Sequence, residues 1–381
     1  FVDLGVTPLA NHYLTAEEVA ANDYPRLPLE VRVCPGCRLV QTTENVDPAT
    51  IFKADYAYFS SYSDSWLRSA KVYAERMIER FGLGARSLVV EIASNDGYLL
   101  QYFAKSGIPV LGVEPAGEVA DKAISIGVPT EKKFFGVSTA EDLAARGYSA
   151  DLMPANNVLA HVPDIRDFLT GFSTLLKPEG VATFEFPHVL NLINGVQFDT
   201  IYHEHYSYLS LMAVETICAA VGLRVFDVER ISTHGGSLRV FVSRAGASWE
   251  EGAELNRVRR LEQDAQLDTK AGYEGFQEQV AAVEVAFREF IRTQRQAGLR
   301  VAAYGAAAKG NTFLNVCGAT SEDIDFAVDR NASKQGKFLP GSHIPVLDPG
   351  EVFTRKPDVL LILPWNLKAE ISEQMKGVRE W

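Results

Sequence analysis

Apolar positions along the chain follow two different spacings. In residues 64–81 they recur three and four positions apart, which predicts an amphipathic helix. Further along, short apolar runs alternate with helical stretches, and this rhythm predicts a parallel sheet covered on both faces. The predicted strands are 88–92, 110–113, 151–155 and 181–186, and the helices between them include 97–105, 116–125 and 164–176.

The predicted sheet ends in a hairpin. After a helix at about 210–221, strand-like residues 224–231 and 237–243 are joined by a short glycine-containing loop, so the last strand should run antiparallel to its neighbours. Residues 249–297 are charged and helical, and we interpret them as a connector. A second α/β unit follows, with strand-like runs at 299–305, 325–329 and 359–363.

Composition narrows the class of protein. The 381 residues exceed one core of usual size, so several domains are expected. A net charge of −12 argues against nucleic acid or an anionic membrane as partner. Apolar runs stay below the roughly 18 residues that a membrane span needs, and four scattered cysteines suit a reducing cytoplasm. The chain starts at Phe1 rather than Met, so we expect residues upstream.

A candidate cofactor site follows the first strand of the sheet. This strand runs into a tight turn that opens a helix, and the second strand ends in an acidic residue that could accept from ribose hydroxyls. The turn lacks GxGxxG, and Asp96 would repel a pyrophosphate. S-adenosylmethionine, which carries a sulfonium and an ammonium, tolerates an acidic turn and is favoured, although a plain strand–turn–helix stays possible. The candidate residues are Glu91, Ser94, Asn95, Gly97, Glu114, Pro115 and Asn156.

A cluster of titratable and aromatic groups follows the last parallel strand. Residues 202–208 read YHEHYSY, and histidine, glutamate and tyrosine at the carboxyl edge of a sheet suit proton abstraction next to a carbonyl. A solvated loop that caps a helix is the alternative. Two histidines at a spacing of two, without a further ligand run, do not form a usual zinc pattern.

These motifs together resemble the sugar C-methyltransferases that methylate nucleotide-linked 4-keto-6-deoxy sugars. The resemblance covers nearly the whole chain, and FDTIYHEHYSY is its most specific part. Its other parts are DLGVTPLAN, DYAYFSSYS, EIASNDGYLL, NNVLAHVPD, FEFPHV, GGSLRVFV, AAYGAAAKGNTFLN and VDRNASKQGKFLPGSHIPV.

The resemblance implies roles for particular residues. It suggests Tyr202, Glu204 and His205 as the catalytic group, places Asn157 and His161 beside the reacting sugar, and has Tyr56 reach in from the amino-terminal segment. It also implies a zinc-binding amino-terminal domain with two cysteine pairs. Only the pair Cys34 and Cys37 is present, so the other is expected upstream of Phe1. Two further departures are Ala93, where methyltransferases often have glycine, and Pro154, which should distort strand pairing.

The resemblance divides the chain into four units. They are a zinc-binding domain at 1–62, a Rossmann-like methyltransferase core at 63–245, a helical connector at 246–298, and a Rossmann-like domain at 299–381 that helps hold the nucleotide-sugar, which we expect to be dTDP-linked. In the 299–381 domain, small residues and Lys309 follow a strand and open a helix, an arrangement that suits a diphosphate. In the core, backbone N–H groups of the hairpin loop could reach the substrate. Candidate substrate-binding residues are Ser237, Arg239, Lys309 and Asn311. Lys334 and Lys337 could meet phosphate or be solvated.

Carbon methylation requires a carbanion equivalent. A 4-keto group acidifies the hydrogen on C3 or C5, with C3 the expected position. We hypothesise that His205 removes this hydrogen, because imidazole has a pKa near operating pH. Glu204 or Tyr202 would orient this base or stabilise the enolate, and His161 and Asn157 could polarise the ketone. The alternatives are an O- or N-methyltransferase, a nicotinamide-dependent oxidoreductase, and a zinc-organised scaffold without activity.

Overall fold

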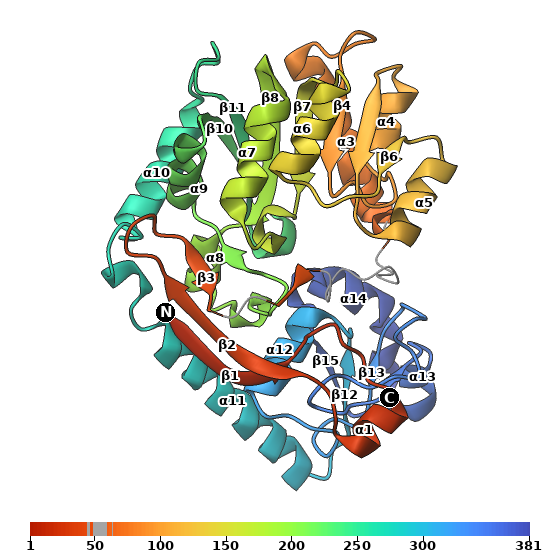
Figure 1. The fold of residues 1–381 in the computed structure, drawn as a ribbon. Helices are drawn as coiled ribbons and strands as arrows, with labels where there is room; N and C mark the ends of the chain where they lie inside the picture. The colour runs from red at the N-terminus through yellow and green to blue at the C-terminus, as the bar shows by residue number, and fades with distance from the viewer. Residues whose placement is uncertain (44–45, 49–58, 63) are drawn as a thin grey trace.

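The computed structural model of the protein describes residues 1–43, 46–48, 59–62 and 64–381, without the side chains of residues 64, 65 and 234. Within these residues the chain forms three sheets, and Figure 1 shows them in two lobes. The upper lobe holds a seven-stranded sheet with its helices, and the lower lobe holds a parallel sheet. A long antiparallel ribbon near the amino terminus runs along the lower lobe. The α/β class predicted from the sequence is confirmed.

The seven-stranded sheet has the order β10-β11-β8-β7-β4-β5-β6. Strand β11 pairs antiparallel with both β10 and β8, so the predicted terminal hairpin is confirmed. Strand β10 therefore runs parallel to the remaining strands, and its loop opens at their carboxyl edge. The strands are β4 Val89–Ile92, β5 Val110–Val113, β6 Thr130–Glu131, β7 Ala150–Asn156, β8 Leu176–Pro187, β10 Leu223–Ile231 and β11 Ser237–Arg244.

Helices cover both faces of this sheet. Phe103 and Met77 belong to a fully buried cluster on one face, and Phe172 and Phe184 belong to a cluster on the other. Each face thus removes large apolar side chains from water. The helices are α3 Asp64–Phe81, α4 Leu100–Lys105, α5 Gly117–Ser125, α6 Val137–Ala145, α7 Ile165–Leu175, α8 Val189–Asn194 and α9 Leu211–Ala220.

The prediction of distorted pairing at Pro154 is confirmed on the β4 side of β7 and wrong on the β8 side. The β7–β8 register runs evenly from Leu152 to Asn156, and the shift lies earlier, between Ala150 and Leu152. Asn157 N–H donates to Glu185 O on β8, so by alternation the missing N–H of Pro154 faces β4. The pairing of β7 with β4 is correspondingly confined to Leu152 and Val89.

The amino-terminal residues form a sheet that the sequence pattern did not predict. Its order is β1-β2-β3-β9, and all neighbours are antiparallel. Strand β9 comes from the YHEHYSY segment, so this segment is part of the amino-terminal sheet. The elements are β1 Val2–Pro8, α1 Ala16–Ala21, β2 Arg26–Val33, β3 Val40–Thr42 and β9 Ser207–Tyr208.

The carboxyl-terminal unit is a parallel sheet of order β14-β13-β12-β15. The connector before it consists of α10 Ala253–Asp264 and α11 Phe276–Gln296, separated by 265–275. A β-bridge between Leu14 and Phe338 joins the amino-terminal segment to this unit. Its elements are β12 Val301–Tyr304, α12 Ala308–Val316, β13 Ala327–Val328, β14 Val346–Leu347, α13 Glu351–Arg355, β15 Val359–Ile362 and α14 Lys368–Gln374.

Single-turn 3-10 helices occur at several connections. They are η1 Ser60–Tyr62, η2 Leu159–His161, η3 Phe198–Thr200, η4 Thr233–Gly235, η5 Ala271–Tyr273, η6 Trp365–Leu367 and η7 Lys376–Glu380. Two of them, η2 and η3, lead into the residues of the candidate site.

Candidate active site

The imidazole of His205 is held by a carbonyl on one side and a phenol on the other. Its Nδ1 lies 2.9 Å from Thr200 O, and its Nε2 lies 3.0 Å from the Tyr202 hydroxyl. A carbonyl oxygen only accepts, so Nδ1 carries the hydrogen in the neutral ring, and Nε2 accepts from Tyr202. The backbone thereby fixes the tautomer that leaves a basic nitrogen at Nε2.

His161 reaches the same segment from η2. Its Nδ1 donates to Glu204 O at 2.8 Å, and its ring centroid lies 4.6 Å from that of His205. Tyr206 N–H donates to Ala160 O, which holds the two motifs side by side. The structure therefore brings NNVLAH and YHEHYSY together.

Glu204 is a buried carboxyl with a nearby cation. Its side chain accepts from Asn11 Nδ2 at 2.6 Å, and only 5% of the residue is exposed. Burial raises its pKa to about 7, while the Asn11 hydrogen bond and the charge of Lys334 act in the opposite direction. A carboxyl with such a pKa can exchange a proton near neutrality.

Asn157 stands between the two strand ends that border the segment. Its backbone is left-handed, with a φ of 54°, and its N–H donates to Glu185 O. Its buried Nδ2 has no hydrogen-bond partner among the described residues. An unused buried donor is costly, so this amide is suited to donate to a bound ligand.

The turn after β4 is narrow and strained. Ala93, Asn95 and Gly97 have φ values of 56°, 51° and 78°. Glu114, at the end of β5, accepts from Asn95 N–H at 3.0 Å and from Ala116 N–H at 2.9 Å. Pro115 follows it, half-buried before α5. The predicted cofactor residues are thus neighbours at one sheet edge.

Several buried oxygens at this edge lack partners. Within the described residues, no hydrogen bond reaches the side-chain oxygens Glu91 Oε2, Ser94 Oγ, Asp96 Oδ1 and Asn156 Oδ1. Burial, and then repulsion from Glu114 and Asp96, raises the pKa of Glu91 well above its usual range. A ligand with an ammonium and a sulfonium would supply both donors and positive charge, so these residues fit S-adenosylmethionine.

The segment before α3 is tied to this turn. Ser60 N–H donates to Asn95 Oδ1 at 2.8 Å, and Ser61 N–H donates to Asp96 Oδ2 at 3.1 Å. Tyr56, predicted as a catalytic residue, lies outside the described residues.

The hairpin residues predicted to bind substrate have partners inside the sheet. Arg239 donates to Glu185 at 2.9 Å and to Glu229 at 3.0 Å, and its guanidinium lies over the Tyr73 ring. Ser237 Oγ donates to Thr233 O at 3.0 Å. In this arrangement both side chains support the loop, and Arg239 is not directed at the YHEHYSY segment.

Lys309 and Asn311, the predicted substrate-binding residues of the carboxyl-terminal unit, lie in different surroundings. Lys309 Nζ donates to Asn366 at 3.0 Å and lies 5.0 Å from the Trp365 ring centroid, while burial lowers its pKa. Trp365 in turn donates to Asp199 of η3 at 2.6 Å. Asn311 is buried, and its Nδ2 donates to Ala10 O at 2.6 Å, so it holds the amino-terminal segment.

Glu262 is a supporting residue that sequence reasoning missed. From α10 it accepts from His188 Nε2 at 2.7 Å and from the first N–H groups of α9, Leu211 at 2.6 Å and Met212 at 2.9 Å. It therefore fixes the chain on both sides of the YHEHYSY segment. The sequence did not single out Glu262, because it lies in a region whose pattern predicts a charged, solvent-exposed helix.

Cys34 and Cys37 form a tight knuckle. Both are half-buried, and backbone N–H groups of Cys37 and Gly36 lower the pKa of the Cys34 thiol. In the described part of the chain, no three His, Cys, Asp or Glu side chains gather as a metal site would require.

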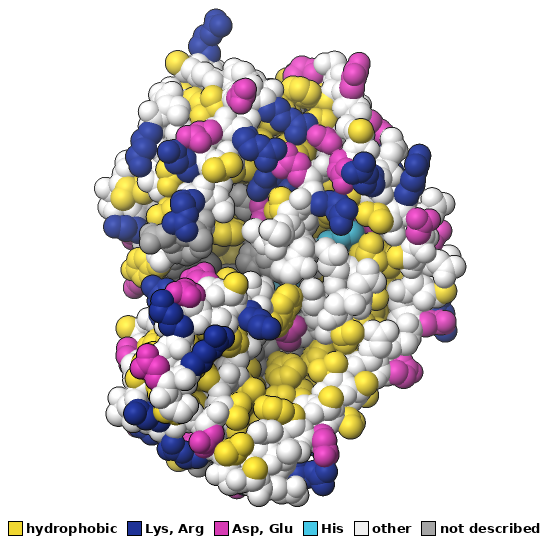
Figure 2. All heavy atoms as spheres, turned by 180° about the vertical axis from the view of Figure 1, so that it is seen from behind, with side chains coloured by type: hydrophobic (Ala, Val, Ile, Leu, Met, Phe, Trp, Pro, Cys, Tyr) yellow, Lys and Arg dark blue, Asp and Glu magenta, His cyan; other side chains and the backbone are white. Residues whose placement is uncertain are grey.

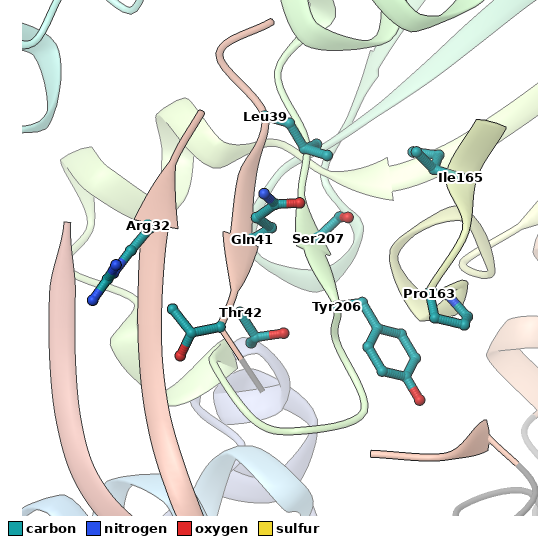
Figure 3. A pocket seen from close by; sticks show the side chains of 9 residues that line it. Arg32, Leu39, Gln41, Thr42, Pro163, Ile165, Tyr206 and Ser207 are labelled. Atoms are coloured by element: carbon teal, nitrogen blue, oxygen red, sulfur yellow. The ribbon is translucent and has the colours of Figure 1, made fainter. Parts of the chain in front are cut away.

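A cavity of about 440 Å³ lies beside the segment, where the amino-terminal sheet meets the core (Figure 3). Gln41 of β3 and Ser207 of β9 border it from the amino-terminal sheet, and Pro163 and Ile165 border it from the core. It contains none of the predicted site residues.

The surface in Figure 2 shows Lys and Arg side chains mixed with Asp and Glu, without a large patch of one sign. Among the helices that the structure describes, none is long and apolar enough to cross a membrane.

Comparisons with known families match three parts of the chain. Residues 1–52 match a family described as "Putative zinc binding domain", residues 66–228 match "Methyltransferase domain", and residues 232–381 match "C-methyltransferase C-terminal domain".

Relatives agree with this division. The chain is 36% identical over 379 residues to C-methyltransferase NovU of Streptomyces niveus, covering 100% of this chain and 90% of that protein. A ubiquinone biosynthesis O-methyltransferase of Rhizobium etli is 30% identical over 97 residues, covering 24% of this chain and 38% of that protein.

Solved structures are more distant. Magnesium protoporphyrin IX methyltransferase from Synechocystis PCC 6803, with bound S-adenosylhomocysteine, gives a TM-score of 0.38 at 15% identity over 47% of this chain and 83% of that chain. This likeness adds nothing to the assignment, which rests on the full-length relative. The oxidoreductase and inactive-scaffold alternatives are therefore wrong, and the chain belongs to the C-methyltransferase family of NovU as an S-adenosylmethionine-dependent enzyme.

Proposed function

We propose that the enzyme methylates C3, the carbon alpha to the ketone, of a dTDP-linked 4-keto-6-deoxy sugar through an enolate. The observation that carries this proposal is the geometry of His205. Thr200 O fixes its Nδ1–H, so Nε2 is left as a base beside the Tyr202 hydroxyl. N-methylation of an amine does not need such a base, because the amine already has a nucleophilic lone pair. O-methylation would use the same base on a hydroxyl, so exchange at the carbon is the measurement that separates the two.

The proton moves from the sugar to His205. The C–H bond alpha to the ketone breaks, its electron pair enters the enolate, and the proton goes to Nε2. The imidazolium that forms keeps its Nδ1–H bond to Thr200 O, which stabilises the positive charge. S-adenosylmethionine, when bound, supplies the electrophilic methyl group that the enolate carbon attacks.

The oxyanion that develops on the ketone oxygen needs a hydrogen-bond donor that is not already in use. Asn157 Nδ2 is buried and unused by the described residues, so we assign it this role. His161 already donates through Nδ1, so its Nε2 could donate only from the cationic ring. Tyr202 is a second donor to the enolate oxygen once substrate takes its place at Nε2.

We place the nucleotide at the carboxyl-terminal unit. Lys309, at the first turn of α12, supplies positive charge next to Trp365, an aromatic surface that borders the core through Asp199. In the amino-terminal domain, Cys34 and Cys37 would supply two thiolates to a structural zinc ion. Metal analysis of the full-length protein that finds no zinc would remove this part of the proposal.

The test is hydrogen–deuterium exchange on a dTDP-4-keto-6-deoxy sugar with enzyme and S-adenosylhomocysteine in deuterated buffer, followed by mass spectrometry. We expect one enzyme-dependent deuterium alpha to the ketone. His205→Ala should abolish the exchange while S-adenosylhomocysteine affinity is kept. His343→Ala, which removes a ring that contacts Tyr24 instead, is the matched control. Absence of exchange with bound substrate would favour O- or N-methylation.

A further inference from the structure

The Glu204 side chain is contacted from outside the methyltransferase core. Asn11, in the connection between β1 and α1, donates to its Oε1 at 2.6 Å. Lys334, in the loop after β13, lies close enough for its charge to act on the same carboxyl. A catalytic-segment residue thus has one partner from each flanking domain.

The segment that carries Asn11 is fixed to the carboxyl-terminal unit, not to the core. Leu14 exchanges backbone hydrogen bonds with Phe338, each at 2.9 Å, and Ala10 O accepts from Asn311. We call residues 10–14 the clasp. Because both ends of the clasp are held by the carboxyl-terminal unit, the position of Asn11 depends on that unit.

Lys334 is joined to the same clasp. Its Nζ donates to Ala306 O at 2.7 Å, and Tyr13 O–H donates to the same carbonyl at 2.5 Å. The ammonium also lies 4.9 Å from the centroid of the Tyr13 ring. Clasp and cation are therefore a single unit, and the Ala306 carbonyl is its common acceptor.

Among the described residues, Lys334 lowers the pKa of Glu204, and Glu204 in turn acts on the Tyr206 phenol of the same segment. The titratable rings of His203 and His205 flank Glu204 in the sequence, and His161 contacts its backbone carbonyl. Asp329 faces Lys334 from β13 and favours the charged ammonium. Ionised Glu204 is buried, so it needs the Asn11 donor and the Lys334 charge to offset its lost hydration.

We propose that Asn11 and Lys334 are positioning residues that keep the Glu204 carboxylate ionised and aimed, so that the catalytic segment is complete only when the clasp is seated on the carboxyl-terminal unit. This inference rests on the proposed function, in which Glu204 belongs to the catalytic group. It extends to His161, because the Glu204 carbonyl orients that ring. The contact between the clasp and the carboxyl-terminal unit is thereby linked to the charge of Glu204.

The test uses the full-length enzyme with Asn11→Leu and Lys334→Met. The carboxylic-acid band that Glu204→Gln removes from the infrared spectrum is followed across pH, together with the pH profile of methyl transfer. In the unmodified enzyme the band should titrate near pH 7. Each substitution removes a group that lowers this pKa, so the midpoint should rise by about one pH unit, a tenfold change in the ionisation constant.

Activity should follow the midpoint. At pH 7 the turnover of each variant should fall roughly three- to tenfold and recover as pH rises past the new midpoint. Lys334→Arg keeps the charge and should keep the midpoint. Lys368→Met removes an exposed lysine at the start of α14 and is the control.

An unchanged infrared midpoint in folded Asn11→Leu and Lys334→Met would overturn the inference. A loss of turnover at every pH would do the same, because it would indicate damage to the fold and not a change in ionisation. Full turnover of Glu204→Gln would instead remove Glu204 from the catalytic group. The infrared midpoints would still decide whether Asn11 and Lys334 set its ionisation.

Discussion

The turn after β4 and the turn after β12 are built on the same plan. Each follows a first parallel strand, and each is held by an acidic residue at the end of the second strand. Glu114 accepts from Asn95 N–H at 3.0 Å in the core, and Asp329 accepts from Ala306 N–H at 2.7 Å in the carboxyl-terminal unit. The acidic residue therefore shapes both turns and does not by itself identify a cofactor.

The surroundings of the two turns differ in charge and in unused hydrogen bonds. In the described core, one buried oxygen of Glu91 and one of Asp96 have no hydrogen-bond partner. In the carboxyl-terminal unit, Lys309 and Lys334 bring positive charge, and Ala306 O is already an acceptor twice. One backbone geometry thus lies beside unpartnered carboxyl oxygens in the described core and beside two lysines and an interdomain contact in the carboxyl-terminal unit.

The largest effect is expected from glycines in the two turns. A Cβ on Gly305 would lie 2.4 Å from ring carbons of Pro364, whereas a Cβ on Gly97 would meet the end of the Val128 side chain at 3.2 Å. Gly305→Ala should therefore lower the free energy of unfolding by about 2–4 kcal/mol and Gly97→Ala by about 1–2 kcal/mol. Urea unfolding measures both, and equal losses would break the comparison.

Replacing the acidic residue should weaken S-adenosylhomocysteine binding at the turn after β4 and not at the turn after β12. Glu114→Ala removes the carboxylate that we expect to accept hydrogen bonds from the ribose hydroxyls. The affinity for S-adenosylhomocysteine should therefore fall by about 10–100-fold. Asp329→Ala should leave this affinity within about twofold, since its turn does not face that ligand. Titration calorimetry gives both constants. A similar loss in Asp329→Ala would show that the two turns share one ligand site.

Replacing Lys309 should weaken binding of the nucleotide and leave binding of S-adenosylhomocysteine unchanged. Lys309→Met should weaken dTDP binding by roughly three- to tenfold at low salt, less at high salt, and should leave S-adenosylhomocysteine affinity unchanged. Lys105→Met, at the exposed end of α4, is the control. Unchanged dTDP affinity in Lys309→Met would place the diphosphate elsewhere.

The smallest expected effect is the release of a proton when S-adenosylhomocysteine binds. Burial and neighbouring carboxylates raise the pKa of Glu91 well above its usual range, so the free enzyme should hold a proton there more readily than at an exposed glutamate. The ammonium of S-adenosylhomocysteine favours the ionised form, so binding near pH 7 should release up to about one proton. Calorimetry in buffers of different ionisation enthalpy measures this release. It should disappear in Glu91→Gln, and proton uptake would contradict the assigned charge of the site.

Sequence periodicity predicted the elements with long or strongly apolar patterns. Helix α3 and strand β5 have the predicted bounds, 64–81 and 110–113. The two-residue strand β6 is too short to show a period, and α6 after it was not predicted. Strand β1 was missed because a register shift between Asp3 and Val6 breaks its alternation.

The site was predictable where its residues share a motif. Tyr202 and His205 lie in one heptapeptide, and they contact each other as neighbours on a turn would. The Asn11–Glu204 bond spans 193 positions, and such long-range partners leave no local pattern. The ion pairs of Arg239 are of the same kind, since its partners Glu185 and Glu229 lie 54 and 10 positions away and no local pattern marks them; its predicted role in substrate binding stays a prediction.

The strand β9 has a consequence for synthesis of the protein on the ribosome. Val40 of β3 pairs with Tyr208 of β9, so 168 residues (208 − 40) must be made after Val40 before the outer edge of β3 can be covered. At about 5–20 residues per second this takes roughly 8–34 s. During that interval β3 presents unpaired backbone groups close to two free thiols, which is a risk for pairing between nascent chains. Slow translation or low temperature during expression lengthens the exposure, and an isolated amino-terminal domain would keep that edge permanently open.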